Sequence, residues 1–407
     1  MPFRIALSGL NAATSDLNVT ANNIANSNTT GFKSSRSEFA DVFTASGLGS
    51  GNTSVGNGVR VAAVTQQFSQ GAIQFTNNNL DLAISGEGFF TLSDPTGLAY
   101  TRNGSFGVDR DGYIVNSANQ RLQVYPAIDG VSGTFNTGTL TDLRLQTAQS
   151  APQATTSGEV VVNLPANTQV PAVGVFDPAD PQTFNFTTST AVYDSLGTQS
   201  TATFYFLKTA NPNEWQVAMT IDGTQVGGLV PLQFSDTGAL TSPATGDVAF
   251  PAYTPVTGAG PLNITFDFGQ STQYGGQFAV SALNQDGFSA GRLTSIDISD
   301  VGVVFARFTN GRALELGKAA LSNFPNPQGL RQIGDSSWAE TFASGGVIRG
   351  EAGSASFGLI QAGALEGSNV DLTQELVNMI TSQRTFQAKA QMISTADQIT
   401  QTIINIR

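Results

Sequence analysis

The chain has 407 residues, enough for roughly two or three domains, and its formal net charge is −12. This acidic balance argues against nucleic-acid binding, which needs a basic surface. Cysteine and histidine are both absent, which excludes disulfides and thiolate chemistry and removes the commonest general acid–base and transition-metal ligand. Charged residues are only 12% of the chain, so the surface must be polar but weakly charged, which suits dense self-association.

The first predicted element is an amphipathic helix near the N-terminus. Apolar residues recur there in alternating steps of four and three, the a/d spacing of a coiled coil. Pro2 suits the first turn, and Gly31 supplies a stop. The members of this apolar seam are Phe3, Leu7, Leu10, Thr14, Leu17, Ala21 and Ile24.

The start of the chain, "MPFRIALSGL", lacks the apolar segment of a secretory signal peptide. The sequence also has no apolar run of about 18 residues, the length that a membrane-spanning helix needs. We therefore expect no cleavable signal and no membrane insertion.

A Gly/Ser-rich connector is predicted at residues 44–58, and it lacks the Lys-Ser/Thr of a phosphate-binding loop. From about residue 50 to residue 360 the chain is predicted to be β-rich. Residues 201–209 and 214–223 are predicted as strands joined by "ANPN". Four dipeptides are typical of hairpin turns: Asn103-Gly104, Asp111-Gly112, Asp222-Gly223 and Asn310-Gly311.

One segment alternates strictly between apolar and polar residues, which predicts a half-buried strand. Its apolar members are Leu262, Ile264, Phe266 and Phe268. Segments rich in Pro, Thr and Ala or Gly, at 150–182 and 241–261, either bracket an inserted domain of about 150–285 or lie within it.

A second amphipathic helix is predicted at the C-terminal end, where Asp371 and Gln374 are spaced like a capping box. Its apolar seam contains Leu372, Leu376, Met379, Gln383, Phe386, Ala390 and Ile393. A second stripe, one position over, contains Met392, Ala396, Ile399, Ile403 and Ile406.

Two interpretations of these helices are open. In the first, both helices pack on the protein's own core, as most apolar stripes do. Burying four or five large apolar side chains offers on the order of 10 kcal/mol per helix, and an isolated helix with one seam is only marginally stable. We therefore predict that the helices pair with each other and that the second stripe packs on another copy of the chain.

The sequence offers no catalytic, cofactor-binding or metal-binding motif. "DRDG" at 109–112 lacks the remaining acidic positions of a calcium loop and is predicted to be a hairpin turn. Scattered carboxylates leave glycoside hydrolysis formally open but without a local motif. An enzyme or a secreted adhesin is therefore a minor alternative to an assembly protein.

The opening "SGLNAATSDLNVTANNIANSNTTGFK" (8–33) closely resembles the N-terminal signature of the flagellar rod and hook axial proteins. Residues 364–399 resemble the matching C-terminal signature, with Lys389 where these proteins usually carry Asn. "LAISGEGFF", "YTRNGSFGVDRDGYIV" and "FTNGRALELGKAALSNFPNPQGL" resemble the family's shared β domain. The insert 150–285, with "AVYDSLGTQSTATFYFLK", points to the hook branch of the family; a distal rod or other axial protein is the alternative.

The resemblance implies a multidomain protein with terminal α-helices and nested all-β domains, in which the chain goes outward and returns. The expected domains are 1–30 with 366–407 (helical), 31–70 with 340–365 (connector), 71–149 with 286–339 (shared β domain) and 150–285 (inserted outer domain).

The expected function is that of a structural hook subunit, which polymerises into a curved tube and acts as a universal joint. The resemblance implies rod, hook-cap and hook–filament junction proteins and the type III export apparatus as partners, and an extracellular place in the hook–basal body. We expect no enzyme activity and no cofactor. The expected polymerisation interface consists of Phe3, Leu7, Leu10, Leu17, Ile24, Leu372, Leu376, Met379, Phe386, Ile393, Ile399, Ile403 and Ile406.

Overall fold

The computed structural model describes residues 2–43, 56–128, 133–145, 149–354 and 356–405. The chain divides into two compact units. Unit 1 combines 1–146 with 295–307 and 313–407, and unit 2 combines 147–294 with 308–312. The predicted nesting is confirmed, since the middle of the chain builds one unit and both ends build the other. The predicted connector at 44–58 falls mostly outside the described residues.

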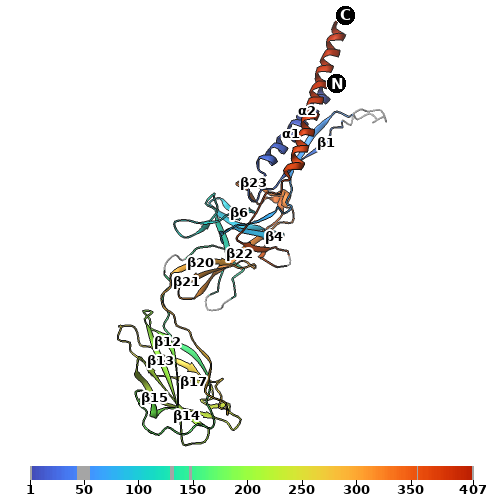
Figure 1. Ribbon diagram of the computed structural model, residues 1–407. Helices are drawn as coiled ribbons and strands as arrows, with labels where there is room; N and C mark the ends of the chain where they lie inside the picture. The colour runs from blue at the N-terminus through green and yellow to red at the C-terminus, as the bar shows by residue number, and fades with distance from the viewer. Residues whose placement is uncertain (1, 44–55, 129–132, 146–148, 355, 406–407) are drawn as a thin grey trace. The chain divides into compact units, whose positions relative to one another are not determined.

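The two ends of the chain form an antiparallel helix pair, α1 (Pro2–Ala25) and α2 (Leu372–Asn405), shown in blue and red in Figure 1. The predicted pairing of the terminal helices is therefore confirmed. A two-stranded antiparallel ribbon, β1 (Ser35–Asp41) with β2 (Val59–Gln66), packs against α1. Such a ribbon is marginal alone, so its packing on the helix contributes to its stability.

Gly31 is not the helix stop that the sequence predicted. α1 ends at Ala25, and Gly31 follows in a turn with φ +68°. A Cβ at Gly31 would lie 2.5 Å from the backbone nitrogen of Asn103. The residue must be glycine because the backbone there is left-handed and touches another segment.

The β body of unit 1 is one large sheet. Its main path runs β20-β21-β22-β9-β5-β6-β24-β23, with β7, β8, β10 and β25 attached at its sides. The strands are β5 (Phe89–Asp94), β6 (Gly97–Thr101), β7 (Gly107–Val108), β8 (Ile114–Val115), β9 (Arg121–Pro126), β10 (Thr141–Asp142), β20 (Leu293–Ile298), β21 (Val303–Phe308), β22 (Ala313–Asn323), β23 (Arg331–Gly334), β24 (Ser337–Ala339) and β25 (Ile348–Glu351). Its apolar core includes Phe90, Leu92, Leu122 and Leu321.

Two short pairings join the N-terminal and C-terminal segments of unit 1. β3 (Ile73–Phe75) pairs with β27 (Ala364–Glu366), and β4 (Leu82–Ser85) pairs with β26 (Leu359–Ala362). Short 3₁₀ turns complete the described helices: η1 (Pro181–Thr183) in unit 2, and η2 (Pro327–Gly329) and η3 (Phe342–Ser344) in unit 1.

Unit 2 is a β-sandwich with a large aromatic core. Its first sheet runs β12 (Phe186–Tyr193), β13 (Gln199–Lys208), β14 (Glu214–Ile221), β15 (Thr224–Phe234) and β16 (Leu240–Ser242). Its second runs β17 (Asp247–Ala249), β18 (Thr265–Asp267), β11 (Ser157–Asn163) and β19 (Ala279–Gln285). Phe204 on the first sheet meets Phe266 on the second edge-to-face, with ring centroids 4.8 Å apart. Both rings are fully buried, so the two sheets share one core.

Most of the predicted strands and turns are confirmed. β13 and β14 form the predicted antiparallel hairpin, and Leu262, Ile264, Phe266 and Phe268 are all buried as alternation requires, although β18 spans only part of that segment. Three of the four turn dipeptides join paired strands, and Asp222 and Gly223 both have positive φ. Asn103-Gly104 is the exception. It lies between β6 and β7, which do not pair, and the Asn103 side chain accepts from the Ser105 amide instead.

Of the capping box predicted at the start of α2, the Asp371 half is present. The Asp371 carboxylate accepts hydrogen bonds from the backbone amides of Thr373 and Gln374 at 2.9 and 3.1 Å. The reciprocal half of the capping box is wrong, because the Gln374 side chain donates to Asn378 rather than to the backbone of the cap residue.

Candidate assembly surface of the terminal helices

The contact between α1 and α2 follows a heptad register. Ser382 donates to Asp16, Asn23 donates to Glu375, and a Cβ at Gly9 would lie 3.2 Å from Cδ of Lys389. Each step of seven residues along α1 matches a step of seven back along α2. We call these three pairs the contact line.

The contact line is built from small and polar residues rather than apolar ones. The buried residues of α1 are Ala6, Gly9, Ala12, Ala13, Thr20 and Asn23. On the described part of α2, Ser382 is the buried residue. Small side chains let the helix backbones approach closely, but such a contact buries little apolar area and supplies little hydrophobic stabilisation. The apolar seams, whose burial was the reason for predicting the pair, therefore do not supply the residues of this contact line.

The apolar seams lie beside the contact line on both helices. Leu10, Leu17 and Ile24 follow the contact residues of α1 by one position, and Met379, Phe386 and Ile393 follow those of α2 by four. In an antiparallel helix pair, these steps turn both helices toward the same side of the pair. These residues form what we call the apolar strip: Phe3, Leu10, Leu17 and Ile24 with Leu372, Met379, Phe386 and Ile393. The strip is a composite of both ends of the chain.

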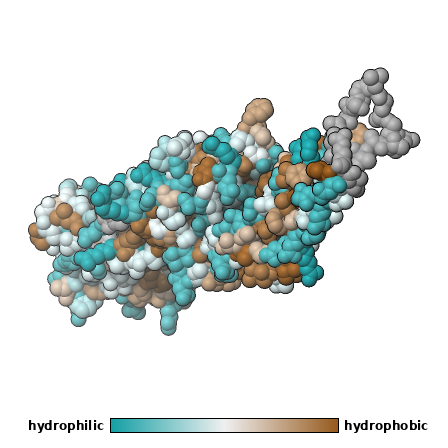
Figure 2. Space-filling view, turned by 90° about the horizontal axis from the view of Figure 1, so that it is seen from above, coloured by the Kyte–Doolittle hydropathy of each residue, from teal (hydrophilic) through white to brown (hydrophobic). Residues whose placement is uncertain are grey.

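The apolar strip remains accessible to solvent in the described chain. Leu10, Leu17, Ile24, Met379 and Ile393 are half-buried. Phe3, Leu7, Leu372, Leu376, Phe386 and Ile399 are between 36% and 56% exposed. The Ile403 side chain and Ile406 lie outside the described residues. Figure 2 shows one face of the molecule on which brown apolar residues reach the surface among teal polar ones.

The opposite side of the helix pair is covered by the ribbon. The backbone amide of Val59 donates to the Ser8 hydroxyl at 3.2 Å. The Asn23 side chain donates to the Ser35 carbonyl at 2.8 Å and accepts from the Ser35 amide at 2.9 Å. Within its own chain α1 therefore packs on α2 and on the ribbon, and the apolar strip is the side that neither of them covers.

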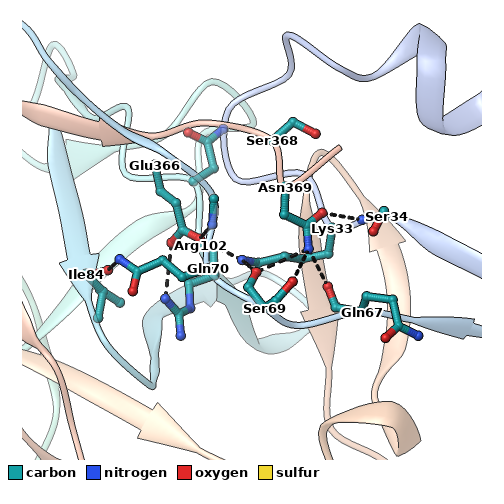
Figure 3. A network of polar contacts seen from close by, with 12 residues as sticks. Lys33, Ser34, Gln67, Ser69, Gln70, Ile84, Arg102, Glu366, Ser368 and Asn369 are labelled. Atoms are coloured by element: carbon teal, nitrogen blue, oxygen red, sulfur yellow. Dashed lines mark hydrogen bonds and ion pairs between the residues drawn. The ribbon is translucent and has the colours of Figure 1, made fainter. Parts of the chain in front are cut away.

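A buried charge cluster joins the helix pair to the β body. Glu366 accepts from Lys33 Nζ at 2.6 Å and from an Arg102 Nη at 3.1 Å, and all three side chains are 5% exposed or less. The Gly71 backbone amide donates to the same carboxylate at 2.9 Å. Figure 3 shows these residues converging from segments far apart in the sequence. We call Lys33, Arg102 and Glu366 the charge hub.

Burial dominates the electrostatics of the hub. Loss of solvent lowers the pKa of Lys33, and the neighbouring Glu366 carboxylate opposes that shift. Burial likewise lowers the pKa of Arg102 against the same carboxylate. Two cations share one anion, so the Glu366 carboxylate offsets much of the cost of burying both positive charges.

Asn369 extends this network to the start of the ribbon and α2. Its side chain accepts from the Ser34 amide at 2.7 Å and donates to the Gln67 carbonyl at 2.7 Å. Lys33 Nζ also donates to the Ser69 carbonyl at 2.7 Å. Both ends of the chain are therefore fixed to the same point of the body.

Sequence reasoning missed the hub. A usable signal was present: Lys33 and Glu366 are two charges in a chain with few of them, and each lies in a terminal signature segment. Lys389, the departure from the family signature, packs its aliphatic stem over Gly9 of the same chain.

Among the described residues there is no cluster of three or more acidic side chains arranged to hold a metal ion. None of the helices in the described part of the chain is long and apolar enough to cross a bilayer.

Comparison with known proteins identifies the family. Residues 3–33 match the flagella basal body rod protein family, and 361–406 match the flagellar basal body rod FlgEFG protein C-terminal family. Residues 83–170 match the flagellar hook protein FlgE/F/G D1 domain, and 163–288 match the flagellar basal body protein FlaE D2 domain. The flagellar hook proteins FlgE of Salmonella typhimurium and Escherichia coli are each 39% identical, over the full length of both chains. The chain belongs to the flagellar hook protein family.

More distant hook proteins extend the comparison. Hook protein FlgE of Borreliella burgdorferi is 34% identical over 98% of each chain. The crystal structure of Helicobacter pylori hook protein FlgE2 shares 15% identity and a TM-score of 0.56, and it aligns with 72% of this chain and all of that one, which supports the fold. The D2 match, at residues 163–288, falls largely on the predicted insert 150–285. The family is structural, and no enzyme activity belongs to it.

Proposed function

We propose that copies of this chain polymerise into the hook through their terminal helices, with the apolar strip as the principal contact between copies. The observation that carries this proposal is the incomplete burial of the strip: Phe3, Leu372 and Phe386 are exposed, and the other five of its eight apolar residues are only half-buried within the described chain. Leu7, Leu376, Ile399 and Ile403, with Ile406 beyond the described residues, complete the proposed interface.

The energy balance explains why polymerisation would be favourable. Fully burying a large apolar side chain contributes about 1.5–3 kcal/mol, so covering the strip contributes on the order of 10 kcal/mol for each copy. The small, polar contact line offers each helix much less within one chain. We expect the terminal segments to be weakly ordered before assembly, because their apolar residues lack partners.

We further propose a division of labour along the chain. The helical segments 1–30 and 366–407 form an inner tube that transmits torque, 31–70 and 340–365 connect it, and 71–149 with 286–339 form the shared β layer. Residues 150–285 form the outer domain, whose weakly charged surfaces exchange water-bridged contacts as the tube bends. Such a tube acts as a universal joint, since neutral contacts break at a lower desolvation cost than buried ion pairs.

The proposed location is the extracellular hook of the flagellum. Export would use the flagellar type III apparatus without a cleavable signal peptide, and an absence of cysteine suits passage as an unfolded chain. Rod, hook-cap and hook–filament junction proteins are the proposed partners beyond the copies themselves.

The assembly proposal is tested by a charge placed in the strip. Leu17→Asp should abolish tubes seen by negative-stain electron microscopy of the purified chain in precipitating salt. Asn18→Asp, which adds the same charge at the next, exposed position, should assemble as the unmodified chain does. Tubes of normal length from Leu17→Asp would refute the role of the strip.

The bending proposal is tested by shortening the outer unit. The Ser150 amide donates to the Gly291 carbonyl at 2.8 Å, so a short turn can replace the residues between them. Tubes of this variant should lose the curvature of the full chain, and curved tubes would refute the role of the outer domain. Straight tubes from the unmodified chain would favour the rod alternative.

A further inference from the structure

A pocket lies between the helix pair and the ribbon, on the side opposite the apolar strip. Its volume is about 380 Å³, and its apolar walls include Ala12, Ala13, Phe39 and Val59. Thr385 and Lys389 of α2 also line it. Phe39 is 45% exposed although it faces this pocket, so the ribbon leaves an apolar wall uncovered. We call this space the ribbon pocket.

The end of α2 extends past α1. When the register of the contact line is continued by one heptad, Pro2 at the start of α1 lies opposite Ala396 of α2. Residues 397–405 therefore have no α1 residue beside them, and Ile399 and Ile404 are 56% and 66% exposed. This α2 end is a helical segment with apolar side chains that the described part of its own chain leaves exposed.

We propose that the ribbon pocket of one copy receives the α2 end of a neighbouring copy. This inference rests on the proposed assembly through the terminal helices. Different surfaces of two copies would meet, which is the kind of contact that builds open helical filaments. It is a second contact between copies, separate from the apolar strip.

Charge supports this occupant over any other apolar segment. Among the described residues no carboxylate pairs with the ammonium of Lys389, whose side chain lines the pocket. The last turn in the described part of α2 contains no basic side chain, and Arg407 lies outside the described residues. A cation next to a helix C-terminus is stabilising, so Lys389 of one copy suits the α2 end of the next.

Length supports it as well. If residue 405 of the neighbour lies level with Lys389, its Ile399 and Ile404 lie level with residues 383 and 388, inside the span of α2 that lines the pocket. That alignment needs an offset of sixteen residues between copies, about 24 Å along the helix axis at 1.5 Å per residue. Charge and apolar contacts are thus satisfied by the same offset.

Disulfide trapping tests the proposal, and the chain has no cysteine of its own. A chain carrying Phe39→Cys is mixed with a chain carrying Ile399→Cys, assembled into tubes and oxidised. We expect a cross-linked dimer at least several-fold more abundant than with Val377→Cys, an α2 position of similar exposure outside the α2 end. If Phe39→Cys hinders assembly, Thr385→Cys replaces it on the same pocket.

The outcomes separate the two proposals. Absence of tubes from the unmodified chain would refute assembly itself. Tubes without the cross-link, although both thiols react with a maleimide, would refute the ribbon-pocket contact alone. A cross-link of Phe39→Cys to Leu7→Cys instead would assign the pocket to the apolar seam and likewise overturn the inference.

Lys389→Met provides a second measurement because it keeps the stem over Gly9 and removes the charge. It should raise the lowest concentration that yields tubes several-fold, whereas Arg384→Met, at an exposed α2 position, should not. Equal concentrations for both variants would refute the role of Lys389.

Discussion

The core of unit 2 and the contact between the terminal helices place their large apolar side chains in opposite positions. Unit 2 gathers its phenylalanines inside, so Phe204, Phe266 and Phe268 are fully buried between two sheets. The helix pair places Gly9, Asp16 and Asn23 at its contact and leaves Phe3, Leu7 and Leu372 exposed.

The difference separates folding from assembly. A β-sandwich with a closed apolar core gains its hydrophobic stabilisation within one chain. The helix pair gains little until another copy covers the apolar strip. The charge hub lies between these two kinds of structure, since it fixes the helices to a β body that is already folded.

The largest effect is expected from breaking the hub. Glu366→Gln leaves Lys33 and Arg102 buried without their shared anion, which should lower the free energy of unfolding of unit 1 by about 3–5 kcal/mol. Trp338 lies in unit 1 and Trp215 in unit 2, so fluorescence in urea follows unit 1 after Trp215→Phe.

An exposed ion pair gives the matched control for the hub. Glu38→Gln removes the partner of Arg36, a pair in which both side chains are more than 40% exposed, and should cost less than about 1 kcal/mol. If Glu366→Gln and Glu38→Gln lowered the free energy of unfolding equally, burial of the hub would not be what makes its charges important for stability.

A core truncation in unit 2 should be costly for folding and neutral for assembly. Leu232 is fully buried and pairs with Trp215 across two strands. Leu232→Ala should lower the free energy of unfolding of unit 2 by about 2–5 kcal/mol. Trp215 fluorescence in a Trp338→Phe background measures this change. Tubes should still form, because the contact proposed between copies lies on the helices. Loss of tubes while unit 2 remains folded would show that the two regions are not independent.

The smallest effect is expected from acid. Burial acts to raise the pKa of Asp286, whereas hydrogen bonds from Thr156 and Ser157 act to lower it. The hydrogen bonds outweigh burial, so the pKa of Asp286 lies below the ordinary value of an aspartate. The unfolded carboxyl binds its proton at a higher pH than the folded one, and unit 2 should lose stability as the pH falls from about 4. Asp286→Asn should weaken this dependence in urea titrations between about pH 3 and pH 7. An unchanged slope would exclude Asp286 as its source.

Much of the fold could be predicted because the signals are local. The a/d steps from Phe3 to Ile24 predict α1, and strict alternation around Phe266 predicts which side chains are buried. Turn chemistry predicts Asp222-Gly223, where both residues need positive φ. The same dipeptide logic fails at Asn103-Gly104, because tertiary contacts with the segment at Leu82 decide its conformation.

The candidate site was only half predictable. Apolar periodicity finds Leu10 and Leu17 but does not say which side of a helix its own chain covers. The structure shows that Gly9 and Asp16, one position earlier, form the contact. The hub joins Lys33 to Glu366 across almost the whole sequence, and local pattern carries no information about such a pairing.

Amide hydrogen exchange tests the central claim most directly, by comparing α1 and α2 in the free chain and in assembled tubes. The apolar strip predicts weak protection of residues 3–24 and 372–405 in the free chain, strong protection of β13 and β14 in both states, and strong helix protection in tubes only. The claim would be contradicted if the amides of both helices exchanged as slowly in the free chain as those of β13. The helix pair would then be stable without other copies.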